Sequence, residues 1–294
     1  MPKITNIRVD DVRFPTSKDL TGSDAVHTDP DYSAVYVTVY TSDETLTGYG
    51  IAFTIGKGND IVAECAKHFF PMFIGISTDE LENEIGNIWY QCVDHSQLRW
   101  LGPEKGVVHM AVAAIFNSLW DLIAKKNKKP LWQFIVESSP DKIINWLTFK
   151  NIEDVLTKDE AYKILIENQK YKEERIKKVL DEGYPSYTTA AGWLGYSDEK
   201  TVELCKKYTS MGWKHFKVKV GLDLEADVKR LDLIRSTIGN DCFIMVDANQ
   251  QWSVEQSIKH INAYKKFDLF FVEEPTSPDD VMGFKKIKEA VGDV

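Results

Sequence analysis

The stretch HFKVKVG, residues 215–221, decides how the second half of this chain is interpreted. It has the length and apolar content of a short buried strand, yet it contains two lysines. Successive side chains on a strand point to opposite faces, so Lys217 and Lys219 lie on the same face. Two neighbouring ammonium groups on one face of a buried strand indicate a role beyond packing.

Strand and helix patterns alternate on both sides of this stretch. Apolar segments are each followed by a segment with helical spacing, and Ser197 and Ser253 occupy positions typical of helix N-caps. The apolar segments are residues 186–195, 215–221, 241–252 and 268–275. This alternation predicts a parallel sheet with crossover helices. We therefore expect an α/β fold in which residues 184–294 form the first half of a (β/α)8, TIM-like barrel, because only about half of the units of such a barrel are present.

Charged residues follow three of these strands at the same end. Lys219, Asp247 and Glu273 recur about one strand–helix unit apart, each at the carboxyl end of its strand. Taken singly, each has an ordinary explanation: a solvated edge lysine, a capping or turn aspartate, and a glutamate in a salt bridge. Such coincidences at one end of adjacent strands are improbable together, and the catalytic groups of (β/α)8 barrels lie at that end. We therefore predict a functional site there.

Proton abstraction next to a carboxylate is the chemistry that suits this set. The oxygens of Asp247 and Glu273 are ligands that Mg²⁺ prefers, and a bound cation would stabilise an enediolate. A lysine must be neutral to accept a proton, and both a neighbouring ammonium group and a metal cation favour the neutral form. We expect Lys219 to take the α-proton while Lys217 stays charged and holds the substrate carboxylate.

Residues 1–135 have a different pattern, in which strands come before helices. The predicted strands are residues 4–14, 33–40 and 45–56. The last two are joined by the short turn TSDE, which indicates a hairpin. Helical spacing follows at residues 60–75, 79–95 and 103–126. We expect an α+β capping domain with substrate-specificity loops over residues 1–135.

A charged segment with helical spacing, residues 136–183, separates the two parts. Thr157 and Glu160 are spaced as a capping box, which marks the start of a helix. Because runs of this kind are usually exposed to solvent, we interpret the segment as a solvated connector.

Composition and charge bear on partners and location. The 294 residues are 43% hydrophobic and 28% charged, as in soluble globular proteins, with a formal net charge of −9. This charge argues against nucleic acid or a membrane as a partner. Four cysteines without a CxxC pair suit a reducing compartment, and residues 1–14 do not resemble a secretory or transit peptide. We expect a cytoplasmic homo-oligomer, with a mitochondrial location left open, that acts on a small molecule.

Longer motifs around these residues resemble a known family. In the second half they are FKVKVG, VDANQQW and FVEEPTSPDD; earlier in the chain they are GSDAVHTDPDYSAVYV, QLRWLGPEKGVVHMA and YPSYTTAAGWLGYSD. Together they resemble the mandelate-racemase-type branch of the enolase superfamily over nearly the whole chain. The KxK, DxN and EEP set is specific for the superfamily, whereas GSDAVHTDPDY points to its sugar-acid dehydratases, with L-fuconate dehydratases the closer match.

The resemblance implies a role for each matching residue. Asp247 and Glu273 would bind Mg²⁺, and Lys219 would be the proton donor and acceptor. Lys217 and Asn249 would contact the substrate. A cap loop would close over the sugar, with contacts from Gly22, Ser23, Asp24 and Tyr32. Trp193 and Tyr196 either line the sugar pocket or pack in the interior, and His27 in the cap loop is left equally open.

The implied activity is that of an Mg²⁺-dependent acid-sugar dehydratase, similar to L-fuconate dehydratase. It would remove the proton beside the carboxylate and eliminate the 3-hydroxyl group, giving a 2-keto-3-deoxy sugar acid. A 2-hydroxy-acid racemase or epimerase shares the first step, and a catalytically inactive truncated isoform that acts by binding is a further alternative. In the family, a third metal-binding carboxylate and a histidine backed by an aspartate lie on later strands. The sequence stops at Val294, so we expect it to be the N-terminal part of a longer protein.

Overall fold

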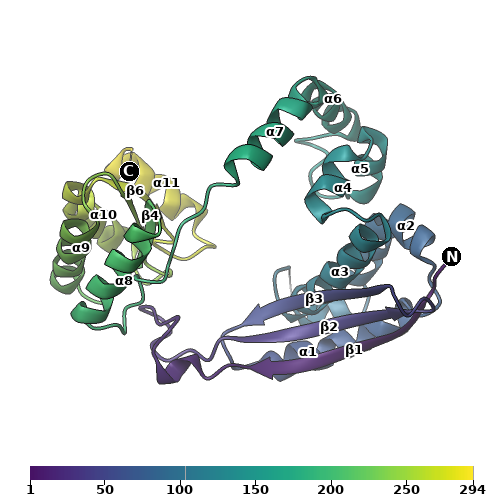
Figure 1. Ribbon diagram of the computed structural model, residues 1–294, viewed down its shortest axis with the longest axis horizontal. Helices are drawn as coiled ribbons and strands as arrows, with labels where there is room; N and C mark the ends of the chain where they lie inside the picture. Colours follow the sequence, from purple (N-terminus) through teal and green to yellow (C-terminus); the bar gives the residue numbers. More distant parts are fainter. Residues whose placement is uncertain (103, 294) are drawn as a thin grey trace. The chain divides into compact units, whose positions relative to one another are not determined.

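The computed structural model describes residues 1–102 and 104–293, and these fall into two compact units (Figure 1). The first unit consists of Met1–Phe14 and Tyr32–Gly183; the second consists of Pro15–Asp31 and the chain from Tyr184 onward. This division differs from the predicted one in two places. Residues 136–183 belong to the first unit instead of standing apart, and the loop at 15–31 belongs to the second.

An antiparallel sheet of three strands forms one layer of the first unit. Its strands, in spatial order, are β1 (Ile4–Arg13), β2 (Ser33–Thr41) and β3 (Thr47–Thr54). The predicted hairpin is present, because β2 and β3 pair directly with Ser33 opposite Thr54. Side chains alternate along β2, so that Val35, Val37 and Val39 are fully buried against the helices.

Helices cover the inner face of this sheet. They are α1 (Asn59–Phe69), α2 (Thr78–Val93) and α3 (Val107–Lys126), with the 3₁₀ turns η2 (Phe70–Met72) and η3 (Leu98–Leu101) between them. All three correspond to predicted helical stretches, although Pro103, at the start of one of these stretches, lies outside the described residues. α3 has the length and composition of a membrane span, but 61% of its most apolar window is buried, as in the core helix of a globular unit.

Strand β3 and helix α3 approach each other unusually closely. A Cβ atom on Gly48 would lie 2.1 Å from the carbonyl oxygen of Ser118, and one on Gly50 would lie 2.2 Å from that of Ala114. Only glycine fits at these positions, because the atoms in the way belong to the backbone. The contact also brings three polar side chains of α3 to backbone groups of β3. Asn117 donates to the carbonyl of Ile51 at 3.0 Å, Asp121 accepts from the N–H of Tyr49 at 2.8 Å, and Lys125 donates to the carbonyl of Thr47 at 3.0 Å.

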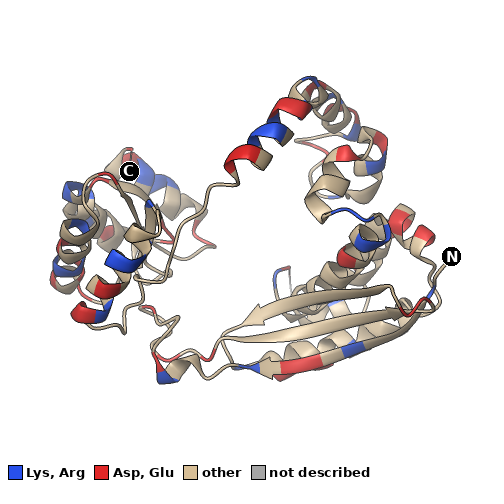
Figure 2. Ribbon diagram, viewed as in Figure 1, with Lys and Arg blue, Asp and Glu red and all other residues tan. Residues whose placement is uncertain are grey.

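Shorter helices follow α3 within the first unit. They are α4 (Leu131–Glu137), α5 (Pro140–Trp146), α6 (Lys158–Asn168), η4 (Gln169–Tyr171) and α7 (Lys172–Glu182). The predicted capping box is confirmed: Thr157 accepts from the N–H of Glu160, whose carboxylate accepts from the N–H of Thr157. Figure 2 shows acidic and basic residues along α6 and α7, where Ala161 is the only buried residue among those described.

The second unit is built on a parallel sheet covered by helices. Its strands are β4 (His215–Lys219), β5 (Phe243–Asp247) and β6 (Leu269–Glu273), in that spatial order. Its helices are α8 (Asp198–Ser210), α9 (Leu224–Ile238), α10 (Val254–Tyr264) and α11 (Val281–Val291), with short 3₁₀ turns at η1 (Thr16–Lys18) and η5 (Lys265–Phe267). Val218, Ile244 and Val246 pack against these helices in a separate core. The predicted N-caps at Ser197 and Ser253 are confirmed.

One predicted strand is only partly formed. In the segment 186–195, Thr188 alone joins the sheet, as a parallel bridge to Phe216. Its N–H donates to the carbonyl of His215 and its carbonyl accepts from the N–H of Lys217, both at 2.9 Å. The chain turns immediately afterwards, where the N–H of Gly192 donates to the carbonyl of Thr189 at 2.9 Å. The carbonyl of Gly192 then accepts from the N–H of Lys219 at 2.9 Å, so the segment stays beside β4 without forming a regular strand.

Candidate active site

Strand register places the predicted site residues side by side. Lys219 is the partner of Asp247 between β4 and β5, and Asp247 is the partner of Glu273 between β5 and β6. All three residues therefore occupy the carboxyl ends of adjacent parallel strands. Lys217 lies two residues before Lys219 on the same face. The sequence pattern and the structure agree on this convergence.

The charged groups form one connected network. The Nζ atom of Lys219 lies 2.6 Å from Oδ2 of Asp247 and 2.7 Å from Oδ1 of Asn249. The Nζ atom of Lys217 lies 3.1 Å from the same Asp247 oxygen and 2.7 Å from Oε2 of Glu273. The other oxygen of Asp247 accepts from the N–H of Asn249 at 3.0 Å, which holds the turn after β5. Lys217 thus bridges the two carboxylates that were predicted to bind metal.

Burial and charge fix the ionisation of two members of this network. Lys217, Lys219 and Asp247 are 8%, 8% and 2% exposed. Burial alone would lower the pKa of Lys217, but its hydrogen bond to Glu273 and the charge of Asp247 outweigh burial and raise that pKa. Burial alone would raise the pKa of Asp247, but the hydrogen bond and charge of Lys219 outweigh it and lower that pKa. Lys217 is therefore a cation and Asp247 an anion at neutral pH.

Aromatic rings lie beside both lysines. The Nζ atom of Lys219 is 5.8 Å from the ring centre of Trp193, and that of Lys217 is 5.0 Å from the ring centre of Tyr187. Trp193 therefore lies at the site, whereas the hydroxyl of Tyr196 pairs with that of Thr21 at 2.7 Å. Tyr187 was not among the predicted site residues. It lies in the predicted strand segment 186–195, which also contains Trp193, and this position could have indicated it.

Part of the predicted cap loop packs within the same unit. Ser23 accepts at Oγ from the N–H of Gly195 at 2.9 Å, and its carbonyl accepts from the N–H of Leu194 at 3.2 Å. Gly22 has the left-handed φ of 90° that this turn needs. The loop therefore contacts the segment that carries Trp193.

Two predicted cap-loop contacts have other partners in the structure. The Asp24 carboxylate accepts from the N–H groups of Val26 and His27 and pairs with Nδ1 of His27 at 3.1 Å, so it holds the loop itself. Tyr32 belongs to the first unit, where its ring packs edge-on against Phe53 at 4.9 Å. Gly22, Ser23 and Asp24 thus share a unit with Lys219, and Tyr32 does not.

The carboxylates of Asp247 and Glu273 fit part of a magnesium site. Both supply hard oxygen ligands, and both already bind one cation, the Lys217 ammonium, at 3.1 and 2.7 Å. Within residues 1–102 and 104–293, His, Cys, Asp and Glu side chains form no cluster of three or more suited to a metal. The two carboxylates would therefore supply only part of the coordination shell.

Family models match most of the chain. The model for the mandelate racemase/muconate lactonizing enzyme N-terminal domain matches residues 13–135, and the model for the enolase C-terminal domain-like family matches residues 200–294. The chain belongs to the mandelate racemase branch of the enolase superfamily. The family predicted from the KxK, DxN and EEP motifs is confirmed, as is its fold of a capping domain and a barrel domain.

Known members of this branch are similar along nearly the whole chain. The crystal structure of human mitochondrial enolase superfamily member 1 aligns with a TM-score of 0.95 and 43% identity, covering 98% of this chain and 66% of that one. The L-galactonate dehydratase of Hypocrea jecorina is 44% identical over 98% of this chain and 64% of its own length. A Streptomyces coelicolor racemase with bound magnesium aligns with a TM-score of 0.71 and 25% identity, covering 99% of this chain and 67% of that one. This chain spans about two thirds of the length of these relatives.

Proposed function

We propose that this chain carries the base and two of the metal ligands of an Mg²⁺-dependent acid-sugar dehydratase, with L-fuconate or a similar aldonate as substrate. The observation that carries the proposal is the network in which Lys217 and Lys219 meet Asp247 and Glu273 at adjacent strand ends. Support for the reaction class comes from the L-galactonate dehydratase of Hypocrea jecorina, at 44% identity. Support for magnesium comes from the Streptomyces coelicolor racemase.

Each lysine has a distinct part in this proposal. Lys217 is a buried cation and can hold the substrate carboxylate by a charge-assisted hydrogen bond. Lys219 stands beside it on the same face and takes the proton from the carbon next to that carboxylate. Asn249, 2.7 Å from Lys219, positions this amine and contacts the substrate.

Asp247 and Glu273 would hold the magnesium ion, because their oxygens already converge on one cation. A bound Mg²⁺ supplies positive charge that stabilises the negative charge developing on the substrate. Ser23 holds the loop at 15–31 against the segment of Trp193, and Asp24 holds the turn of the loop itself. We propose that this loop, with Gly22, Ser23 and Asp24, shapes the sugar pocket.

A test of this function is incubation of the intact protein with a library of acid sugars in D₂O, with and without Mg²⁺. NMR would follow both exchange of the α-proton and formation of 2-keto-3-deoxy acids. We expect both to occur with L-fuconate or L-galactonate and to require Mg²⁺. Absence of exchange with every acid sugar would refute the proposal.

Racemisation or epimerisation is the second candidate, because the Streptomyces coelicolor racemase shares this fold and binds magnesium. It begins with the same removal of the α-proton by Lys219. The same experiment distinguishes the two, since exchange with inversion and without a keto product would identify an epimerase.

A further inference from the structure

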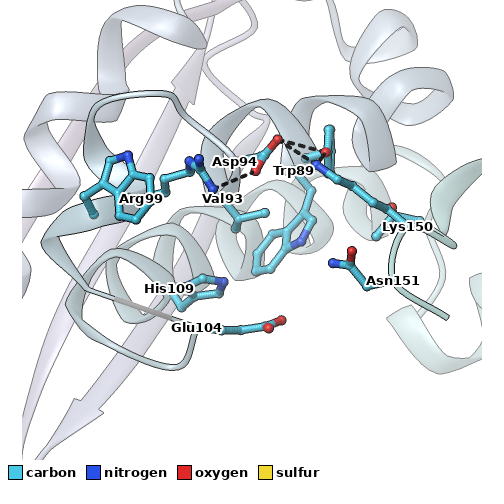
Figure 3. Close-up of a pocket in the computed structure, with 11 residues that line it drawn as sticks. Trp89, Val93, Asp94, Arg99, Glu104, His109, Lys150 and Asn151 are labelled. Atoms are coloured by element: carbon cyan, nitrogen blue, oxygen red, sulfur yellow. Dashed lines mark hydrogen bonds and ion pairs between the residues drawn. The ribbon is translucent and has the colours of Figure 1, made fainter.

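Charged side chains outside the lysine network differ in how deeply they are buried. In the first unit, Asp94 and Lys150 line a cavity of about 360 Å³ (Figure 3). Their side chains are 37% and 53% exposed and pair at 3.1 Å, as ordinary surface ions do. In the second unit, by contrast, Asp227 is only 2% exposed. Burying a carboxylate costs stability unless its partners are well placed, so those partners indicate what Asp227 does.

Asp227 holds the chain directly after the strand that carries both lysines. It lies near the start of α9, and its Oδ2 atom accepts from the N–H of Gly221 at 2.9 Å. Gly221 follows Lys219 by two residues and has a positive φ of 124°, which glycine adopts readily. The same Oδ2 atom accepts from the hydroxyl of Tyr264, a fully buried residue of α10, at 2.8 Å. The carboxylate therefore ties the end of β4 to two helices.

Arg230 holds a second segment that borders Lys219. It lies three residues after Asp227 on α9, and residues at this spacing are neighbours on one face of a helix. Its guanidinium donates to the carbonyl of Trp193 at 2.5 Å. The ring centre of Trp193 lies 5.8 Å from the Nζ atom of Lys219. One face of α9 thus holds both the strand end and the aromatic residue that lie beside this amine.

We propose that Asp227 and Arg230 are positioning residues for Lys219, acting through Gly221 and Trp193. This inference rests on the proposed function, in which Lys219 removes the α-proton. A lysine amine sits on a flexible four-carbon chain, so its position depends on the backbone and the surfaces around it. A misplacement of about 1 Å can lower the rate of a reaction by about 10²-fold. An apolar residue could fill the place of Asp227 without the cost of burying a carboxylate, but it could not hold the end of β4.

Kinetics of variants test this role. Asp227→Leu removes the acceptor of the Gly221 N–H, and Arg230→Met removes the donor to Trp193. The measurement is α-proton exchange in D₂O by the intact protein with Mg²⁺, followed against the concentration of the acid sugar. We expect each variant to lower kcat by about tenfold to 10²-fold while KM changes by less than about threefold. Asp227→Asn and Arg230→Lys keep an acceptor and a donor, so each should recover most of the lost rate.

A matched control separates positioning from stability. Ile238→Ala changes a buried residue at the far end of α9 from Asp227, so it should lower the free energy of unfolding and leave kcat unchanged. Circular dichroism and urea unfolding verify that each variant is folded, and Arg230→Met carries the test alone if Asp227→Leu does not fold. An equal loss of kcat in Ile238→Ala, or an unchanged kcat in the folded variants of Asp227 and Arg230, would overturn the proposal.

A second measurement does not depend on turnover. In protein labelled with 5-fluorotryptophan, the fluorine NMR signal of Trp193, assigned with Trp193→Phe, should shift in Lys219→Met because the amine lies beside that ring. We expect the same shift in the Ile238→Ala background and a clearly smaller one in the Asp227→Leu and Arg230→Met backgrounds. An undiminished shift in those two would refute positioning. Absence of exchange with every acid sugar would refute the proposed function instead, and the fluorine signal would then decide the positioning role by itself.

Discussion

The two sheets of this protein differ in whether their buried side chains carry charge. On the antiparallel sheet of the first unit, β2 places Val35, Val37 and Val39 in the core. On the parallel sheet of the second unit, Lys217, Lys219 and Asp247 are buried at strand ends. Burying ions costs stability unless each is paired, and well-packed apolar residues often do better. The first sheet is therefore built for packing, whereas the second accepts an energetic cost at the charged cluster that we propose to be reactive.

Replacing the proposed base should give the largest effect. Lys219→Met keeps the length of the side chain but removes the amine, so α-proton exchange in the intact protein should fall by about 10³-fold. NMR in D₂O measures this rate, and circular dichroism checks the fold. The matched control is Lys214→Met, which changes an exposed lysine of the same unit and should have little effect. Equal loss in both variants would remove the distinction between a reactive and a packing sheet.

Removing the bridging cation should lower stability as well as weaken substrate binding. Lys217→Met leaves Glu273 without its partner and Asp247 with one lysine, so the free energy of unfolding should fall by about 3 kcal/mol at neutral pH. Added Mg²⁺ should recover part of this loss, since it can replace the missing positive charge. Urea unfolding with and without Mg²⁺ measures both effects. Undiminished stability in the variant would show that the pairing does not hold the second sheet together.

A packing variant gives the corresponding test in the first unit. In Gly50→Ala the new Cβ atom would lie 2.2 Å from the carbonyl oxygen of Ala114, and neither backbone can move easily. We expect a loss of about 2 kcal/mol in unfolding free energy that salt and Mg²⁺ do not change. Thr47→Ala on the same strand, at a half-buried position, should cost less. A loss for Gly50→Ala that depends on salt would contradict the conclusion that apolar packing stabilises the first sheet.

The smallest effect should come from the paired carboxylate of the first unit, Glu82. Burial alone would raise its pKa, but hydrogen bonds from Lys142, Asn127 and Lys126 lower it from 4.5 to about 2. A lowered folded-state pKa stabilises the protein above pH 4.5, and this contribution disappears as the pH falls towards 2. Glu82→Gln should therefore cost about 1–2 kcal/mol at pH 7 and almost nothing near pH 2.

Unfolding curves across this pH range would reveal the dependence on Glu82. Glu84→Gln, an exposed acid on the same helix, is the control and should show little change. A constant difference between wild type and Glu82→Gln at all pH values would mean that the ion pairs add nothing to stability.

Most of the fold could be predicted because local patterns determine it. Strand alternation, the TSDE turn and serine caps gave the elements of both units, and the period of strand and helix placed Lys219, Asp247 and Glu273 at one end. The strand predicted at residues 186–195 is reduced to a bridge at Thr188, because the turn at Gly192 follows at once. Such a turn depends on contacts with β4 that local patterns do not contain.

Contacts distant in sequence account for the remaining differences. The residues around Ser23 join the second unit through hydrogen bonds to Leu194 and Gly195, about 170 positions away. Spacing alone also could not tell that Lys217 bridges both carboxylates while Lys219 pairs with Asp247 and Asn249. Side-chain rotamers and the register of β4 and β5 decide those partners.

The three polar side chains of α3 that bind β3 have a consequence for aggregation. Asn117, Asp121 and Lys125 recur every fourth residue, so they form a row that binds three backbone groups of the edge strand β3. An unprotected edge with Tyr49, Ile51 and Phe53 on its exposed face would be a template for cross-β polymerisation. Side chains of α3 thus occupy hydrogen-bonding positions that a further strand would use, so the exposed aromatic face of β3 lies beside an edge that is partly blocked to fibril growth.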